Sequence, residues 1–107
     1  MVGEKFPVSG QEVTVCIDRG LERVGQNVKY LVYWHLQKIG QVTRTDMVAD
    51  PDSFVSALRG LYRESAAAVE KAIVQELNVS FDLNYPPTQL AKAIKEARQK
   101  VLQLKAV

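Results

Sequence analysis

The order of apolar and polar positions predicts helices over most of the chain. In the first segment the apolar residues recur every three or four positions, the spacing of one helix face: Val13, Ile17, Leu21 and Val24. Ser9 and Glu12 have the spacing of a capping box, and Gly25 is suited to end this helix. Residues 1–8, which include Pro7, are predicted to form an N-terminal arm.

Residues 27–39 form a segment that is apolar almost all round. In a helical projection, one face carries Val28, Leu31, Val32, His35 and Ile39. The opposite face carries Tyr30, Tyr33 and Trp34. A helix of this kind is normally buried between other elements, so we expect it at the centre of the fold. A strand is the alternative, because Val, Tyr and Trp favour sheets, but the pattern does not alternate. Asn27 is expected as the N-cap and Gly40 as the residue after the helix.

Only Gln26 and Asn27 separate these two predicted helices. A connection this short produces either an αα-hairpin or one sharply kinked helix. In a hairpin, pairing about Gly25 and Gln26 brings Cys16 to the level of His35.

Two short-to-medium helices are predicted next. Thr43 and Asp46 have capping-box spacing, which favours a single helical turn before the first of them. The sequence Asp50-Pro51-Asp52 supplies an N-cap, a proline in the first turn and a favourable negative charge. The apolar stripe of this helix consists of Phe54, Leu58 and Leu61. The following helix begins near Ser65 and faces inward with Ala66, Val69, Ile73 and Leu77, whereas Glu70, Lys71, Gln75 and Glu76 form its polar side.

Residues 78–86 alternate between apolar and polar, and we interpret them as an extended linker whose apolar side chains lie on the core. Residues 87–105 are predicted to form a long helix. Its apolar residues make a narrow heptad seam that suits self-association: Leu90, Ile94, Ala97, Val101 and Leu104. The helix is also basic, with Lys92, Lys95, Arg98, Lys100 and Lys105 against Glu96.

Together these segments predict an all-α fold, a single-domain bundle of about five helices that spans residues 1–107. The chain is 47% hydrophobic and 24% charged, which is ordinary for a globular domain. Its single cysteine, Cys16, cannot form an internal disulfide, so we expect a reducing, cytoplasmic setting. No segment has the length of a membrane span or the pattern of a signal peptide, and no membrane partner is expected.

The order of motifs from Ile17 to Leu77 resembles an archaeal family, the fifth type of the "Nitrosopumilus output domain" series. The motifs that carry the resemblance are Leu21-Glu22-Arg23-Val24-Gly25, Tyr33-Trp34-His35-Leu36, the set Pro51, Phe54 and Leu58, and the set Val69, Glu70, Ile73 and Leu77. One turn departs from the family pattern of an aromatic residue followed by Gly-x-Gly-Ala. Here the corresponding residues are Tyr62-Arg63-Glu64-Ser65-Ala66. The resemblance implies a small helical output or interaction module, and it transfers no catalytic residue.

Two residues could be mistaken for a catalytic pair. Cys16 and His35 could act as nucleophile and base, but no third group or oxyanion donor can be named. One Cys and one His also fall short of the four ligands of a zinc site. We therefore expect His35 as a neutral core histidine with one satisfied nitrogen, with a pH-sensitive or partner-contacting group as the alternative. No catalytic residue, metal or cofactor is predicted.

The aromatic face of residues 27–39 is the candidate partner contact. Tyr30, Tyr33 and Trp34 are expected to pack under later helices. The alternative is that they remain exposed, in which case they would contact a protein partner.

The function predicted from the sequence is therefore a non-catalytic regulatory or protein-interaction module, with self-association through the last helix. The alternative is a nucleic-acid-associated regulator that uses the basic last helix. A net charge of +2 argues against a dedicated nucleic-acid binder. A helix-turn-helix formed by the third and fourth predicted helices is also disfavoured, because its second helix begins with Ala66, Ala67 and Ala68.

Overall fold

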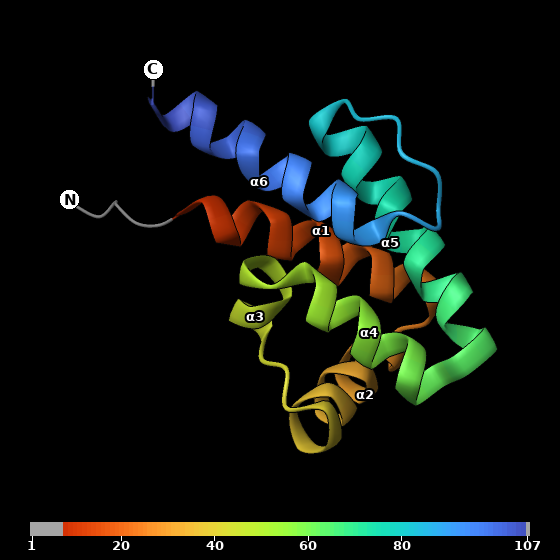
Figure 1. Cartoon of the computed structure of the whole chain (residues 1–107). Coiled ribbons are helices and arrows are strands. Elements are labelled where there is room, and N and C mark those ends of the chain that lie inside the picture. The colour runs from red at the N-terminus through yellow and green to blue at the C-terminus, as the bar shows by residue number, and fades with distance from the viewer. Residues whose placement is uncertain (1–7, 107) are drawn as a thin grey trace.

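The computed structural model describes the backbone of residues 8–106 and the side chains of residues 11–102. The elements in this part of the chain are all helical: α1 (Val8–Val24), α2 (Val28–His35), the π-helix η2 (Leu36–Gly40), α3 (Arg44–Ala49), α4 (Pro51–Tyr62), the 3₁₀-helix η3 (Arg63–Ser65), α5 (Ala66–Phe81) and α6 (Leu90–Ala106). The all-α prediction is confirmed. Figure 1 shows α1 running through the middle, with α5 and α6 on one side and α3, α4 and α2 on the other. The central helix is thus α1. The apolar pattern of residues 27–39 predicted that α2 would be the central helix, and that prediction is wrong.

The packing of α1 on α5 is unusually close at Gly20. A Cβ atom at Gly20 would lie 2.7 Å from the Cα atom of Ile73 and 2.9 Å from its backbone nitrogen. Ordinary carbon–carbon contacts are about 3.5–4.0 Å, so only glycine lets the two backbones approach this closely. On either side of this contact Ile17 and Leu21 are fully buried, as their spacing predicts.

Helix α6 packs on its own chain. Its heptad residues Leu90, Ile94 and Ala97 are fully buried, and Val101 is 2% exposed. These four residues contribute to the core with α1, α4 and α5, so the predicted dimer seam is wrong for them. The side chain of Leu104 lies outside the described residues. Helix α6 packs on its own core because Ala93, which is also fully buried, widens the heptad seam into the broad apolar stripe of a globular core helix.

Helices α1 and α2 form the expected αα-hairpin. Lys29 Nζ donates to Glu22 Oε2 at 2.7 Å, and the Tyr33 hydroxyl donates to Asp18. Both pairs match an antiparallel register centred between Gly25 and Gln26. Asn27 is the N-cap of α2 by position, but its side chain makes no capping hydrogen bond.

Several helix boundaries differ from the predicted ones. Val8, placed in the arm, begins α1, while residues 1–7 lie outside the described part of the chain. The predicted linker 78–86 is helical up to Phe81, and α6 begins at Leu90, not at residue 87. The side-chain amide of Asn78 makes hydrogen bonds with both backbone groups of Tyr85, at 3.0 and 3.1 Å, and so holds the connection against the end of α5.

Local capping chemistry places the middle helices as predicted. Thr43 and Asp46 form the capping box of α3. Asp50 caps α4 by accepting from Ser53, and Pro51 follows in the first turn. The hydroxyl and amide of Ser53 together lower the pKa of Asp50. These signals require only neighbouring residues, so they can be read directly from the sequence.

Candidate interaction surface

Four large apolar side chains of α2 and η2 face solvent together. The exposed fractions are 67% for Tyr30, 52% for Leu31, 55% for Trp34 and 62% for Ile39. We call these four residues the α2 surface. Two of the three predicted contact residues, Tyr30 and Trp34, therefore lie on an exposed face and are not packed under later helices. Leu31 and Ile39, which the helical projection assigned to the core face, belong to the exposed set.

The π-helix η2 explains the position of Ile39. Helix α2 and η2 bury only Val32 and Leu36 completely. At the end of η2 the backbone N–H of Gln41 donates to the carbonyl of Leu36, the five-residue spacing of a π-helix. Each residue of this wider turn rotates less around the axis, so Ile39 falls outside the buried stripe. Gln41, with φ 56°, takes the left-handed conformation that was expected at Gly40.

Tyr33 has a different role from Tyr30 and Trp34. It is partly buried, its hydroxyl donates to Asp18, and Arg44 lies 5.2 Å from its ring centre. Arg44 also donates to Asp18 at 2.7 Å. Burial, followed by the bond to the Asp18 carboxylate, raises the pKa of Tyr33. The residue thus ties α1, α2 and α3 together, and it is not part of the α2 surface.

His35 lies between the α2 surface and the end of α4. Its Nδ1 atom is 2.6 Å from the hydroxyl of Tyr62, and its ring makes an edge contact with Trp34 at 5.4 Å between centres. His35 is half-buried with one nitrogen satisfied, close to the expected core histidine but at the edge of the core. Burial raises the pKa of Tyr62. This contact joins α2 to the turn that begins at Arg63.

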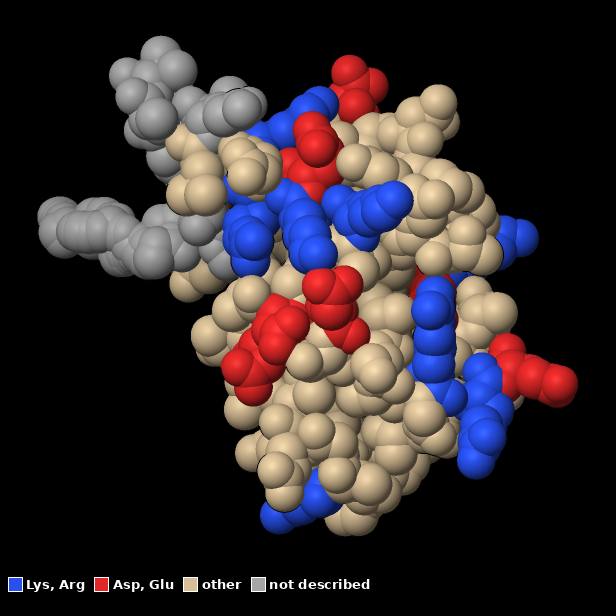
Figure 2. Space-filling model, viewed as in Figure 1, with Lys and Arg blue, Asp and Glu red and all other residues tan. Residues whose placement is uncertain are grey.

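The segment that carries the α2 surface contains basic but no acidic side chains, although acids of neighbouring helices pair with most of these bases. Between Glu22 and Asp46 the sequence contains four basic residues and no acidic residue: Arg23, Lys29, Lys38 and Arg44. Three of them are paired with acids of α1 or α5. Lys38 is exposed and makes no ion pair with any described residue. In the view of Figure 2, the lower part over α2 and α4 is mostly uncharged, with both basic and acidic side chains at its edges.

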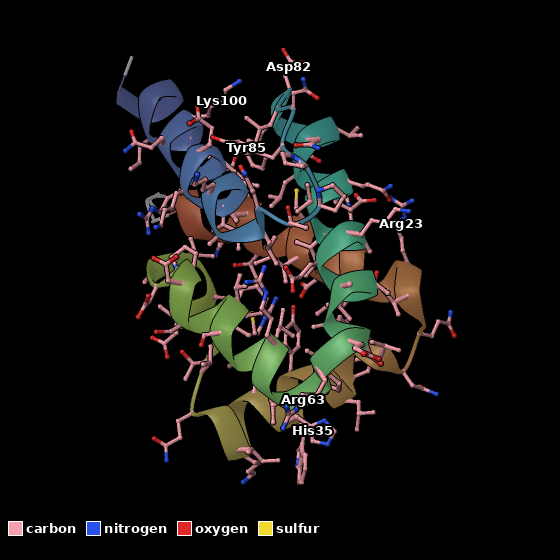
Figure 3. All side chains as sticks on the ribbon, turned by 45° about the vertical axis from the view of Figure 1, so that its right-hand side comes forward. Arg23, His35, Arg63, Asp82, Tyr85 and Lys100 are labelled. Atoms are coloured by element: carbon pink, nitrogen blue, oxygen red, sulfur yellow. The ribbon has the colours of Figure 1, made fainter. Side chains whose placement is uncertain are left out.

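Arg63 is a strained residue at the edge of this surface. Its backbone has φ 54° and ψ −123°, a region that favours glycine and costs a side-chain-bearing residue about 1–3 kcal/mol. Figure 3 shows Arg63 beside His35, at the opposite end of the molecule from Lys100, Asp82 and Tyr85. Within the described part of the chain, the Arg63 guanidinium makes no hydrogen bond or ion pair.

A surface pocket of about 740 Å³ adjoins Arg63. Its lining consists of Arg59, Arg63, Glu64, Ala67, Glu70, Pro87 and Thr88. Arg59 binds the carboxylate of Glu70 with two hydrogen bonds of 3.0 and 3.1 Å, and this bond raises the pKa of Arg59. Glu70, predicted on the polar side of its helix, is 4% exposed, because Arg59 supplies its partner from α4. The lining contains two arginines and two glutamates, so its charges balance. Its ion pair holds α4 and α5 together, and Arg59 also donates to the carbonyl of Thr88 in the 82–89 connection.

Cys16 and His35 do not form a pair. Cys16 is buried against α5, where burial raises the pKa of its thiol although a hydrogen bond from Ser80 lowers it. A thiol that is inaccessible and favours its protonated form is a poor nucleophile. His35 contacts Tyr62 of α4 instead. Among the described residues no group of His, Cys, Asp or Glu side chains could hold a metal ion.

Three basic residues of α6, Lys95, Arg98 and Lys100, are engaged within the chain. Arg98 donates to the carbonyl of Val48 at 2.6 Å, and Lys100 donates to that of Phe81 at 2.9 Å. They thus satisfy the C-terminal ends of α3 and α5, a common use of basic side chains. Lys95 pairs with Asp52 at 2.8 Å. Figure 2 shows basic side chains over α6 directly above acidic ones, an arrangement that weakens any purely basic nucleic-acid surface.

Comparison with known protein families, with curated proteins and with solved structures finds no match to this chain. Within residues 8–106, no helix combines the length and the apolar character needed to cross a bilayer.

Proposed function

We propose that this chain is a non-catalytic protein-interaction module that binds a partner through the α2 surface. The observation that carries the proposal is the exposure of Tyr30, Leu31, Trp34 and Ile39, each of them more than half exposed on one side of one helix. Aromatic and large aliphatic side chains are the residues that dominate binding energies at protein interfaces. Contiguous apolar patches of this kind on soluble domains commonly mark binding sites.

The contacts that fix α2 on the rest of the chain also support this proposal. Tyr33 and Lys29 bind acids of α1, and His35 binds Tyr62 of α4. The helix that presents the α2 surface is thus fixed on two sides. A rigid, preformed surface binds with a smaller loss of conformational entropy than a mobile one.

A regulatory or output role is the biological context that we propose for this binding. The order of motifs between Ile17 and Leu77, which resembles the archaeal output-domain family, supports it. The Tyr33-Trp34-His35-Leu36 motif of that resemblance lies in the helix that presents the α2 surface.

Site-specific photocrosslinking tests the proposal. A photoreactive phenylalanine analogue replaces Tyr30 in the full chain, and in a matched control it replaces Val79, which is 83% exposed on α5. We expect the analogue at position 30 to form a discrete crosslinked adduct with a partner protein. The adduct should be lost when Leu31→Ala and Ile39→Ala are added, and the analogue at position 79 should form none. Equal adducts from both positions, or none from position 30, would refute the proposal.

A further inference from the structure

We propose that the partner segment is acidic and amphipathic, and that Arg63 and Lys38 receive its carboxylates while the α2 surface receives its apolar side chains. This inference rests on the proposed function and names the chemistry of the partner. It is argued from the charges around the α2 surface, from its area and from the conformation of Arg63.

Charge complementarity selects the sign of the partner. The 23–45 region has no acid of its own, and the paired bases already use Asp18, Glu22 and Glu76. Lys38 and Arg63 make no ion pair with a described residue, although Glu64 follows Arg63 in the chain and lines the same pocket. Carboxylates next to an apolar stripe would meet both cations at the rim, where such pairs guide association and exclude partners of the wrong charge.

The backbone conformation of Arg63 also points to a binding role. Glycine would fit its backbone conformation without strain, yet the chain places its longest basic side chain there. The backbone of Arg63 is hydrogen-bonded to Arg59 and Ala66, but its side chain makes no hydrogen bond or ion pair with a described residue. A strained residue whose charged side chain is left unbound is characteristic of a site whose role lies in binding. The neighbouring bond between His35 and Tyr62 places the Arg63 turn beside α2, so a single partner segment can reach both.

The area of the α2 surface favours a short segment over a second copy of the chain. Four side chains that are each more than half exposed offer roughly 500 Å² in total. A stable interface between folded proteins buries about 800 Å² on each side. A symmetric pair presents the same patch from both copies, so the 23–45 region of a second copy would offer Lys38 and Arg63 no acidic residue. A helical segment of another protein needs less area and supplies the missing negative charge.

The test uses three synthetic peptides of about four helical turns, long enough to cover the α2 surface. The first carries leucines on one face and glutamates on the other. The second has lysine at every glutamate position, and the third has the composition of the first without an apolar face. Trp34, the only tryptophan of the chain, reports binding through a shift of its emission to shorter wavelengths. We expect a saturable shift with the first peptide alone.

Variants of Arg63 separate charge from strain, with labelled peptide and anisotropy as the readout. Arg63→Gly removes both, Arg63→Ala removes the charge and keeps the strain, and Arg63→Lys keeps both. We expect Arg63→Gly and Arg63→Ala to weaken binding of the acidic peptide by about fivefold, and Arg63→Lys to retain it. Only Arg63→Gly should raise the melting temperature. Arg19→Glu, an exposed change on α1, should alter binding less than about twofold, while Lys38→Glu should weaken it by about fivefold.

Three outcomes would overturn the inference while leaving the crosslinking test of the α2 surface intact. The first is equal binding of the acidic and lysine peptides. The second is a Trp34 shift with phosphatidylglycerol vesicles but with no peptide, which would identify an anionic membrane as the occupant. The third is a dimer in solution that Leu31→Ala dissociates. A loss of both stability and binding in Arg63→Gly would contradict the role assigned to Arg63.

Discussion

Replacing Gly20 by alanine tests the contact that positions α1 against α5. Inside an ordinary helix, Gly→Ala stabilises a protein by about 0.5–1 kcal/mol, because alanine loses less backbone entropy on folding. At Gly20 the added Cβ would lie 2.7 Å from the Cα of Ile73, about 1 Å closer than a normal carbon contact. The nearest atoms belong to the α5 backbone and cannot rotate away, so the helices must separate.

The magnitude follows from the two opposing effects. Overpacking of a tight core contact costs about 1–3 kcal/mol, and separation of α1 from α5 also loosens Ile17, Leu21 and Ile73. We expect Gly20→Ala to lower the free energy of unfolding by about 2 kcal/mol net. For a domain of this size, the melting temperature then falls by about 8 °C.

Gly60 provides the matched control. A Cβ atom at Gly60 meets nothing within 4 Å. Gly60→Ala should therefore stabilise the chain by about 0.5–1 kcal/mol, the opposite sign for the same chemical change. Urea denaturation followed by far-ultraviolet circular dichroism measures both variants. Stabilisation of Gly20→Ala to the same extent as Gly60→Ala would refute the close approach of α1 and α5.

Three further predictions concern the core and its charges. A chain that ends at Asn84 loses all of α6 and with it a wall of the core, so we expect circular dichroism to show an unfolded chain, whereas a stable helical monomer would contradict the packing of α6. Arg59→Ala leaves the buried Glu70 carboxylate without its partner and should lower the free energy of unfolding, measured by urea denaturation, by about 1–3 kcal/mol. Glu70→Ala leaves a half-exposed arginine and should lower it by about 1 kcal/mol. A larger loss for Glu70→Ala than for Arg59→Ala would show that the pair is not arranged as described. The folded-state pKa values of Cys16 and Tyr33 are raised above their ordinary values of 9.0 and 10.0, so their contribution to stability is fully present below pH 9.0 and is lost as pH rises through the raised values. As the pH rises above 9.0, the melting temperature should fall less steeply in Cys16→Ala and Tyr33→Phe than in the unchanged chain. The same slope in both variants as in the unchanged chain would contradict the burial of these groups.

Local signals in the sequence were sufficient to place most helices. The spacing of Ile17 and Leu21 predicts the buried face of α1, and Asp50 with Pro51 predicts the start of α4. These patterns depend on residues a few positions apart, which the sequence shows directly. The end of α5 differs from the prediction, because residues 79–81 continue the helix although they alternate between apolar and polar.

The position of α6 could not be decided from its heptad spacing. Leu90 and Ile94 would be equally suited to a second copy or to the chain's own core. Ala93 carried the relevant information, since a buried residue beside Ile94 widens the stripe beyond a coiled-coil seam. A small residue contributes little to a hydrophobic pattern, so the spacing alone does not reveal the wider stripe.

The α2 surface was predicted only in part. Tyr30 and Trp34 were named as a partner contact if exposed, and both are exposed. Leu31 and Ile39 were assigned to the core because the segment is apolar all round and its projection assumed a regular α-helix through residue 39. The π-helix η2 changes that register. The absence of acidic residues between Glu22 and Asp46 is the signal in the sequence that Lys38 has no acidic neighbour within its own segment.

The central claim is that binding takes place on α2 and η2. Nuclear magnetic resonance of the ¹⁵N-labelled full chain, titrated with the acidic amphipathic peptide, tests it most directly. The account predicts that the indole N–H of Trp34 and the amides of Tyr30, Ile39 and Arg63 shift in proportion to occupancy, while the amides of α6 do not. Shifts centred on Lys92 and Lys95 of α6, with Trp34 unchanged, would contradict it.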